Sequence, residues 1–374
     1  MKTIVTILTV LFLVPSLYAQ NPSDGGGAPV ITDLPDAQLR VHSESNIYFS
    51  VTNFGIIGSQ GGAYSDYEGN FPVAPGAEFP ADSDIDHLFQ GALWVGAVLD
   101  LDGDPNTLDT LVSVGNDGWW SNVMELWPPP EGYESMWRDS TLGDEEIWAV
   151  FYDTATDQSY VMPDPNDQRP HIPIGLEITR NSIGWRSNGY DELFILNYFI
   201  ENIYDRDLHD LWIGIYYDGD VLHSSENPYS PEEGAQDDLC GFIPYGEHGI
   251  AWIADNNGQP YDGQFDYRSS TGVMGMLYLG SSEPDVQTNF NWWISNVNSE
   301  LDWGPQLQEN YDGPYPGGGN GTPGGDVAKY KVLSNGETDY DQVYCALDFT
   351  DEGWIPPVAN ADDLANGYDT RFLI

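Results

Sequence analysis

The sequence predicts an all-β protein with an antiparallel β-sandwich architecture and few short helices, and three observations support this prediction. Short apolar runs recur along the chain, and turn-forming Gly, Pro, Asn and Asp residues separate them. A helical period of 3.6 sustained over a dozen residues is absent almost everywhere. Many short strands between turns are typical of sandwiches. The 374 residues are enough for one large sandwich or for two packed sandwiches.

The apolar runs give the predicted strands in chain order. They cover residues 47–51, 92–99, 110–114, 146–152, 172–179, 192–203, 208–220, 249–254 and 272–279. The second and third runs should form a hairpin with an Asp-rich loop. The runs at 192–203 and 208–220 are the clearest pair of β-rich segments, and the polar turn 204–207 joins them.

Residues 1–19 are predicted to be a secretory signal peptide. Lys2 precedes the apolar run Ile4–Val14, and the following Pro15–Ala19 segment predicts cleavage after Ala19. The alternative is a transmembrane anchor, but the run is too short to span a bilayer comfortably. No later segment is long and apolar enough to span. We therefore expect a secreted protein, extracellular or at the cell surface.

The rest of the chain divides by composition. Residues 20–40 are polar and rich in Gly and Pro, which predicts a flexible leader. We expect an N-terminal β-rich region over 41–165 and a β-sandwich region over 166–374, with a low-complexity loop at 312–326. The sequence stops within the apolar run 369–374, so we expect the second region to continue in a longer reading frame.

The charge of the chain excludes some partners. There are 60 acidic and 11 basic residues, a formal net charge of -49. Nucleic acid requires Lys and Arg to replace its counterions, and anionic membranes repel such a surface, so we expect neither as a partner. Strong acidity can indicate disorder, but 13 Trp, 23 Tyr and 14 Phe indicate a folded chain with a sizeable core.

Clustered Asp residues predict calcium binding. Calcium takes six to eight oxygen ligands at flexible angles, and Asp and Asn in Gly-containing turns supply them. In LWIGIYYDGD two carboxylates lie two residues apart at a strand end, so they share a face and repel each other unless a proton, water or a cation intervenes. The predicted metal ligands are Asp218, Asp220, Asp237, Asp238, Asp255 and Asn257.

Two other Asp-rich segments are weaker candidates for calcium. One is the hairpin loop with Asp100, Asp102, Asp104 and Asp109, and the other holds Asp262 and Asp266 beyond Asn257. None of these segments has the twelve-residue EF-hand pattern. The alternative is that D-G and N-G pairs simply form turns, as in any all-β protein.

Catalytic motifs are absent, and a carbohydrate-related alternative remains open. No GxSxG motif occurs, and the six His residues lack metal-ligand spacing, so we expect them to be solvated loop residues. Tryptophans at 119–120, 127, 137, 292–293 and 303 either pack in the core or form a sugar platform. Adjacent rings of the doublets point to opposite faces, so one ring of each doublet would be exposed.

Cys240 and Cys345 are the only cysteines. In an exported protein they are candidates for a disulfide that closes a long loop. Two buried free thiols are the alternative, and the sequence does not decide between them.

Several sequence segments between residues 45 and 374, taken in their order along the chain, resemble those of a known protein family. They include VTNFGIIG, AEFPADSDIDHLFQGALWVGAVLDLDGDPNTLDTLVSVG, PIGLEITRNSIGW, LHDLWIGIYYDGDV, AQDDLCGF, IAWIADNNGQP, FNWWISN and YKVLSNGETDYDQ. The chain resembles a family of uncharacterised secreted multidomain β-rich surface proteins from Bacteroidota-like and candidate bacterial phyla.

The resemblance implies an exported surface protein of this architecture. Such proteins often continue into immunoglobulin-like or fibronectin-like modules and a type IX sorting domain, which this sequence lacks. The family tends to be acidic where this chain has its predicted metal ligands, which implies the same calcium site.

The sequence thus predicts a non-catalytic secreted structural or binding protein of the cell surface, with calcium-stabilised loops. Cell-surface components or glycans are the expected partners. The alternative is an extracellular carbohydrate-binding or glycan-hydrolysing module that uses exposed Trp and Asp/Glu pairs. An adhesin-like building block of an extracellular assembly is a third hypothesis, and the oligomeric state is left open.

Overall fold

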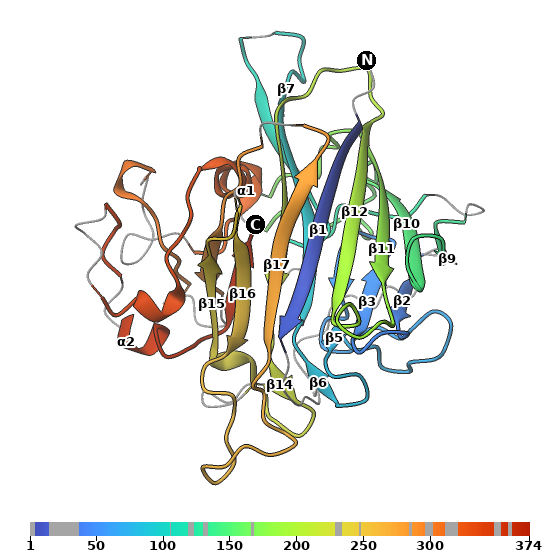
Figure 1. The fold of residues 1–374 in the computed structure, drawn as a ribbon. Coiled ribbons are helices and arrows are strands. Elements are labelled where there is room, and N and C mark those ends of the chain that lie inside the picture. The colour runs from blue at the N-terminus through green and yellow to red at the C-terminus, as the bar shows by residue number, and fades with distance from the viewer. Residues whose placement is uncertain are drawn as a thin grey trace.

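The structure is a computed structural model, and it is described here for part of the chain (Figure 1). The described residues are 4–14, 37–104, 106–118, 123–129, 134–165, 168–228, 234–246, 248–283, 286–295, 302–310, 321–347, 353–357 and 361–374. The predicted leader, apart from its last residues, and most of the predicted low-complexity loop lie outside them, as does the Trp119–Trp120 doublet.

One large sheet has eight strands, seen in front in Figure 1. Their order across the sheet is β15 (Asp238–Ile243), β16 (Ile250–Asp255), β17 (Val273–Ser281), β1 (Ile4–Val14), β12 (Leu193–Asn202), β11 (Leu176–Gly184), β10 (Glu145–Tyr152) and β9 (Met136–Asp139). We call it sheet A. All of its pairs are antiparallel.

The second large sheet, sheet B, has nine strands. Along its main path they are β18 (Asn291–Ile294), β19 (Thr370–Leu373), β13 (His209–Asp218), β7 (Gln90–Leu99), β4 (Ile56–Gly58), β3 (Tyr48–Thr52) and β2 (Leu39–His42). Two further strands branch from it, β5 (Ala77–Glu78) beside β3 and β8 (Asp109–Val114) beside β7. A small separate sheet pairs β6 (Ile85–Asp86) with β14 (Leu222–His223).

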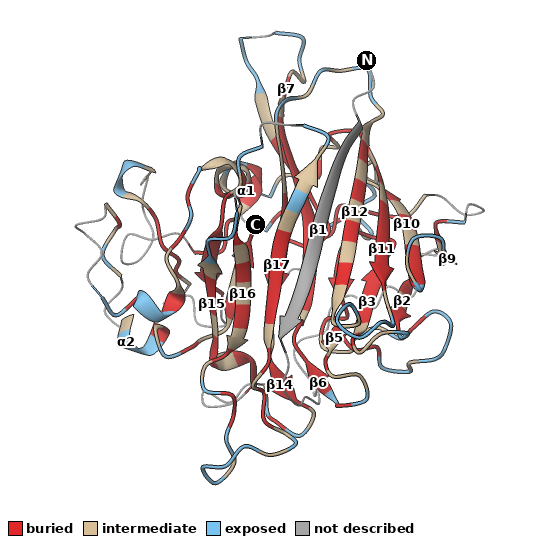
Figure 2. Cartoon of the chain, viewed as in Figure 1, coloured by how far each residue is buried: buried red, intermediate tan, exposed pale blue. Residues whose placement is uncertain are grey.

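The main core lies between the two large sheets. Burial alternates along β12, where Phe194, Leu196, Tyr198 and Ile200 are buried and their neighbours are half-buried, as expected for a strand with one face on a core. A single cluster joins these residues to side chains of sheet B such as Leu93. Figure 2 shows that buried residues follow the strands and that the exposed residues lie mainly in the loops. The all-β sandwich prediction is confirmed.

Helices are few and short in the described part of the chain. They are α1 (Gly325–Ser334), α2 (Ala361–Leu364) and three 3-10 turns at Gly234–Gln236, Gln308–Asn310 and Gln342–Tyr344. None of the described helices is both long and apolar enough to cross a membrane.

Several sequence predictions can be compared with this topology. β7 and β8 form the predicted hairpin with its Asp-rich loop. The predicted neighbours β12 and β13 lie in different sheets, so the turn between them passes from sheet A to sheet B. Both predicted regions, 41–165 and 166–374, contribute strands to both large sheets. The apolar run of the predicted signal peptide forms β1, in the middle of sheet A.

Candidate metal centre

Three carboxylates converge where β13 and β19 pair. Asp218 is the last residue of β13, and Asp220 follows it after one glycine. A Cβ atom on Gly219 would lie only 2.8 Å from Ile253, so a larger residue would clash there. Asp369 directly precedes β19, whose Arg371 is the pairing partner of Asp218. One oxygen from each Asp lies within 4.8 Å of the others.

A single guanidinium group contacts this group of residues, which we call the acidic cluster (Asp218, Asp220 and Asp369). Arg371 Nε lies 3.1 Å from Asp218 Oδ1, and its Nη1 lies 2.6 Å from Asp369 Oδ1. The hydroxyl of Tyr216 donates to Asp218 Oδ2 at 3.1 Å and accepts a bond from Arg371 Nε. Three carboxylates and one guanidinium leave a formal charge of -2 when all four groups are ionised.

Burial makes this excess charge costly. At 4.8 Å, each pair of ionised carboxylates repels by about 3 to 4 kcal/mol at an effective dielectric constant of about 20. Burial, together with the neighbouring carboxylates, raises the pKa of Asp220 well above its usual range. Burial also raises the pKa of Asp218, although Arg371 opposes this shift, and raises that of Asp369 to about 7. The cluster therefore binds either protons or a cation near neutral pH.

A second acidic group lies beside the cluster, at the same end of the sheets. Asp238 opens β15 and is the cross-strand partner of Asp255, which closes β16. Asp238 is fully buried, and the charges of Asp237, Asp220 and Asp255 add to burial in raising its pKa well above the usual range. Burial raises the pKa of Asp255 to about 6. Five of the six predicted ligands are thus close enough to influence one another or the cluster.

Two oxygens of this second group have no hydrogen-bond partner among the described residues. They are Asp238 Oδ1 and Asp255 Oδ2, both buried. The other oxygen of Asp238 accepts a bond from Val221 N–H at 3.3 Å, and that of Asp255 accepts from Asn257 N–H at 2.8 Å. Buried carboxylate oxygens without donors are unusual, and a cation is one way to satisfy them.

The sixth predicted ligand, Asn257, is exposed. Its Oδ1 accepts the N–H of Gln259 at 2.8 Å, which closes a local turn. In the hairpin loop, Asp100 and Asp102 likewise accept backbone N–H groups of their own loop. Asp266 is paired with Arg268 at 2.8 Å. These residues show the turn-forming behaviour that competes with metal binding.

Asp369 and Arg371 belong to the site but do not stand out in the sequence. Both lie in the last apolar run, far from Asp218 along the chain. Only the pairing of β19 with β13 brings them to the cluster. The local signal is weak: an Asp two residues before an Arg at the start of a strand.

Of the two alternatives for Cys240 and Cys345, the structure has the buried free thiols and not the disulfide. Both are buried free cysteines of the same apolar cluster. Burial raises the pKa of both thiols, and each thiol lies near other acidic groups. Protonated thiols of this kind react slowly, because the thiolate is the reactive form.

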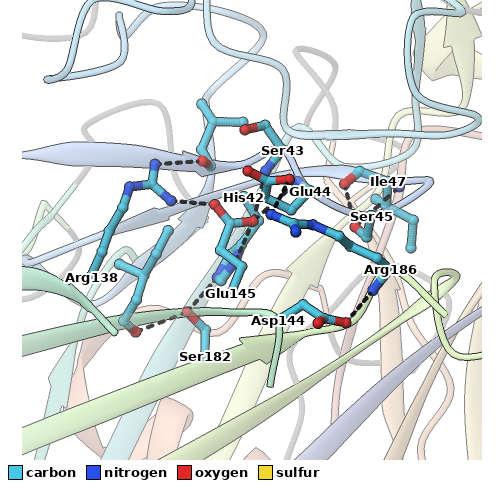
Figure 3. A network of polar contacts seen from close by, with 12 residues as sticks. His42, Ser43, Glu44, Ser45, Ile47, Arg138, Asp144, Glu145, Ser182 and Arg186 are labelled. Atoms are coloured by element: carbon cyan, nitrogen blue, oxygen red, sulfur yellow. Dashed lines mark hydrogen bonds and ion pairs between the residues drawn. The ribbon is translucent and has the colours of Figure 1, made fainter. Parts of the chain in front are cut away.

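Four of the six histidines are buried, so the expectation of solvated loop histidines is wrong for them. They are His42, His87, His171 and His223. His42, the last residue of β2 in sheet B, contacts side chains from two neighbouring strands of sheet A (Figure 3): its Nε2 is 2.7 Å from Ser182 Oγ, and its Nδ1 is 3.3 Å from Glu145 Oε2. Each partner comes from a different strand, which sequence spacing does not reveal.

This Ser–His–Glu arrangement resembles a catalytic triad in its contacts but not in its surroundings. Ser182 and His42 have no exposed surface, and the Ser182 hydroxyl donates to the carbonyl of Ile147 at 3.0 Å. The Glu145 carboxylate already accepts hydrogen bonds from Arg138 and from the N–H of Ser43. A substrate could not reach the hydroxyl, so these contacts hold β2 against sheet A.

The tryptophans are mostly core residues. Both rings of the Trp292–Trp293 doublet are buried, as are Trp127 and Trp303, so the expected exposed ring is wrong for this doublet. Trp137 is half-buried and stacks on Trp148 at 5.9 Å. No described Trp is among the exposed large side chains. β18 is the end strand of sheet B, but both of its faces are covered: Trp292 belongs to the main core, and Trp293 packs in a second apolar cluster with Val332 and Leu333 of α1.

A cavity of about 890 Å³ opens between the sheets, on the side of the turn that joins β12 to β13. Tyr198, Tyr204, Trp212 and Tyr278 contribute rings to its lining. Asp205, Arg206 and Asn289 contribute polar groups. Its mixture of aromatic and polar side chains suits a polar ligand with flat apolar faces.

Comparisons with known proteins give no assignment. No protein-family model matches the chain, and neither a curated protein nor a solved structure was found to match it.

Proposed function

We propose that this is a secreted, non-catalytic structural or binding protein of the cell surface whose β-sandwich is stabilised by calcium at the acidic cluster. The observation that carries the proposal is the convergence of Asp218, Asp220 and Asp369 around one guanidinium group, which leaves a formal charge of -2. The secretory part rests on the N-terminal sequence and on the resemblance described above.

The donor set favours calcium over transition metals. All the side chains in question are carboxylates, and hard divalent cations such as calcium prefer oxygen ligands. Calcium also accepts backbone carbonyls and water at flexible angles, and three carboxylates leave room for them. By joining the end of β13 to the start of β19, a bound cation would fasten two strands that are distant in sequence.

Thermal unfolding in EDTA, followed by a calcium titration, tests this proposal. Calcium that binds only the folded state should stabilise it by about 2.7 kcal/mol at 100 times the dissociation constant. Magnesium and sodium chloride serve as controls for size and screening. A shift no larger than that of sodium chloride at equal ionic strength would contradict calcium binding.

Three matched variants locate the site. Asp220→Asn removes one carboxylate but leaves both ion pairs of Arg371, so it should abolish the calcium response while the chain still folds. Asp139→Asn, at an exposed strand end, should keep the full response. Asp102→Asn tests the hairpin loop: loss of the response in this variant alone would move the site there.

The cavity favours a second candidate function, the binding of glycans. Tyr204 and Trp212 line it together with amide and carboxylate groups, and sugars present both a hydrophobic face and hydroxyls. A glycan array probed with the wild type and with Trp212→Ala tests this. Equal binding by both proteins, or no binding at all, would exclude the cavity as a glycan site.

A further inference from the structure

The strand β1 fills a gap of one strand between β12 and β17 (Figure 1). Its residues 4–12 pair with β12, from Ile4 opposite Glu201 to Phe12 opposite Leu193. On its other side, residues 7–14 pair with β17. Without β1, sheet A would consist of two separate parts, β9–β12 and β15–β17. We call the gap between β12 and β17 the acceptor slot.

The residues of β1 are also the apolar run of the predicted signal peptide. Cleavage after Ala19 would remove them from the exported protein. The facing edges of β12 and β17 would then present unpaired backbone N–H and C=O groups in the middle of the sandwich. Such edges are costly when buried and readily pair with another strand.

The slot does not close by itself at low cost. Both β12 and β17 run antiparallel to β1, so they are parallel to each other. Direct contact would create a parallel pair in a sheet whose other described pairs are all antiparallel. It would also require the two parts to move together by about 4.8 Å, the spacing of neighbouring strands. Both parts pack on one shared core with sheet B, which resists that movement.

The residues beside the slot define the strand that it accepts. On β12, Leu196 is buried in the core and Ile195 faces the other side, half-buried. On β17, Met276 and Leu277 are both buried. Side chains on both faces of the neighbouring strands are therefore apolar, and a suitable strand is apolar on both of its own faces.

The predicted leader does not supply such a strand. Between Gln20 and Asp36 it contains three consecutive glycines and three prolines, and its longest apolar stretch after the glycines is Val30–Ile31. Proline lacks the N–H that a central strand must donate, and glycine weakens strands. The leader therefore does not replace β1 in the slot.

We propose that, in the exported protein, the acceptor slot receives a β-strand from a second polypeptide. The strand is an extended, largely apolar segment of nine to eleven residues that runs antiparallel to both β12 and β17. Main-chain hydrogen bonds supply most of the affinity, as in other cases of strand addition, and the apolar side chains supply the fit. The inference rests on the proposed export, because signal removal empties the slot, but it does not depend on calcium.

Two measurements on the exported protein test this inference separately from the proposed function. The full reading frame is expressed in a bacterium that exports it, and mass spectrometry of the purified product identifies its N-terminus. Residue 20 as the first residue supports processing. An N-terminus that retains residues 4–14 would overturn the inference, because β1 would then stay in place.

Hydrogen exchange on the processed protein is the second measurement. The probe is a synthetic peptide of residues 4–14, with lysines added at both ends for solubility. The control peptide has proline at the positions of Leu8 and Leu11, which removes two N–H donors. Amides of β10 and β11 are the internal reference, because these two strands pair with each other.

The probe should slow exchange at alternate amides of β12 and β17 by about 100-fold, and the proline peptide should not. The same protection without peptide is expected only in assemblies with a partner chain, and these elute before the monomer in size-exclusion chromatography. A processed monomer whose β12 and β17 amides are already fully protected would show that the slot is filled within one chain, by direct pairing or by another strand of that chain. That result would overturn the inference and leave the calcium proposal untouched.

Discussion

At the scale of single residues, Arg371 decides the electrostatics of the acidic cluster. It bonds Asp218 and Asp369 at the same time, and it also donates to the carbonyl of Ser295. One positive charge cannot balance three carboxylates, so the raised pKa of Asp369, about 7, persists beside a bound guanidinium. Protons and a cation therefore compete for the same oxygens.

This competition predicts how stability depends on pH in EDTA. Burial raises the pKa of Asp369 to about 7 and that of Asp255 to about 6, above the values near 4 of unfolded Asp. The folded state therefore binds more protons than the unfolded state between about pH 4 and pH 7. The stabilisation is complete below pH 4 and is lost as the pH rises through 6 and 7, at about 1.4 kcal/mol per pKa unit.

Bound calcium should offset the loss of stability that EDTA-treated protein shows as the pH rises. The difference in unfolding free energy between calcium and EDTA should increase from pH 5 to pH 8, because ionised carboxylates bind the ion best. Urea titrations at several pH values measure both curves, and Asp220→Asn is the control, since it should flatten the difference. A calcium effect that is the same at pH 5 and pH 8 would place the ion away from these carboxylates.

At the scale of elements, α1 is attached to the sandwich by charge as well as by apolar contact. Lys329, 1% exposed, donates to Asp164 at 2.7 Å and lies 3.9 Å from Asp117. Val332 and Leu333 of the same helix pack on sheet B. Buried carboxylates raise the pKa of Lys329 above its usual range despite burial. The helix thus supplies the cation of a buried ionic group.

Replacing the buried lysine should destabilise the protein strongly. Lys329→Met leaves Asp164 and Asp117 without this buried cation and should cost about 3 to 5 kcal/mol. Lys331→Met, on the same helix, replaces a half-buried lysine that donates to the carbonyl of Asn310 and should cost less than about 1 kcal/mol. Chemical unfolding of both variants measures the difference, and equal costs would show that the buried pairing contributes little.

How far the sequence predicts these elements depends on whether local residues decide them. The strands at 92–99 and 209–218 follow from apolar runs that end in turn residues, and Asp218 and Asp220 follow from their spacing on one strand. Asp369 and the pairs of His42 depend on which distant strands meet, and a local pattern carries no information about that. Helix α1 was not predicted, because its ten residues lack a regular apolar stripe and its lysine pairs with acids outside it.

At the scale of the whole molecule, the excess of acid is not balanced internally. Seven of the eleven basic residues form ion pairs with described acids: Arg40, Arg138, Arg169, Arg186, Arg268, Lys329 and Arg371. Since there are 60 acidic residues, most carboxylates depend on water or on dissolved cations for compensation. Repulsion across the surface therefore opposes folding at low ionic strength.

The melting temperature in EDTA should consequently rise with sodium chloride. Between 0.01 and 0.15 M salt the screening length falls from about 30 Å to about 8 Å, which weakens repulsion between separated surface charges. Calorimetry across this range measures the effect, and tetramethylammonium chloride separates screening from specific sodium binding. A melting temperature that does not change with either salt would show that repulsion between the surface charges does not lower the stability.

The position of β19 has a consequence for the order of events during synthesis. Its residues 370–373 lie between β13 and β18, so sheet B lacks an internal strand until the last described residues have left the ribosome. Asp369 reaches Asp218 and Asp220 at the same moment. Sheet B therefore stays incomplete, and accessible to any export machinery, until residues 369–373 have been made.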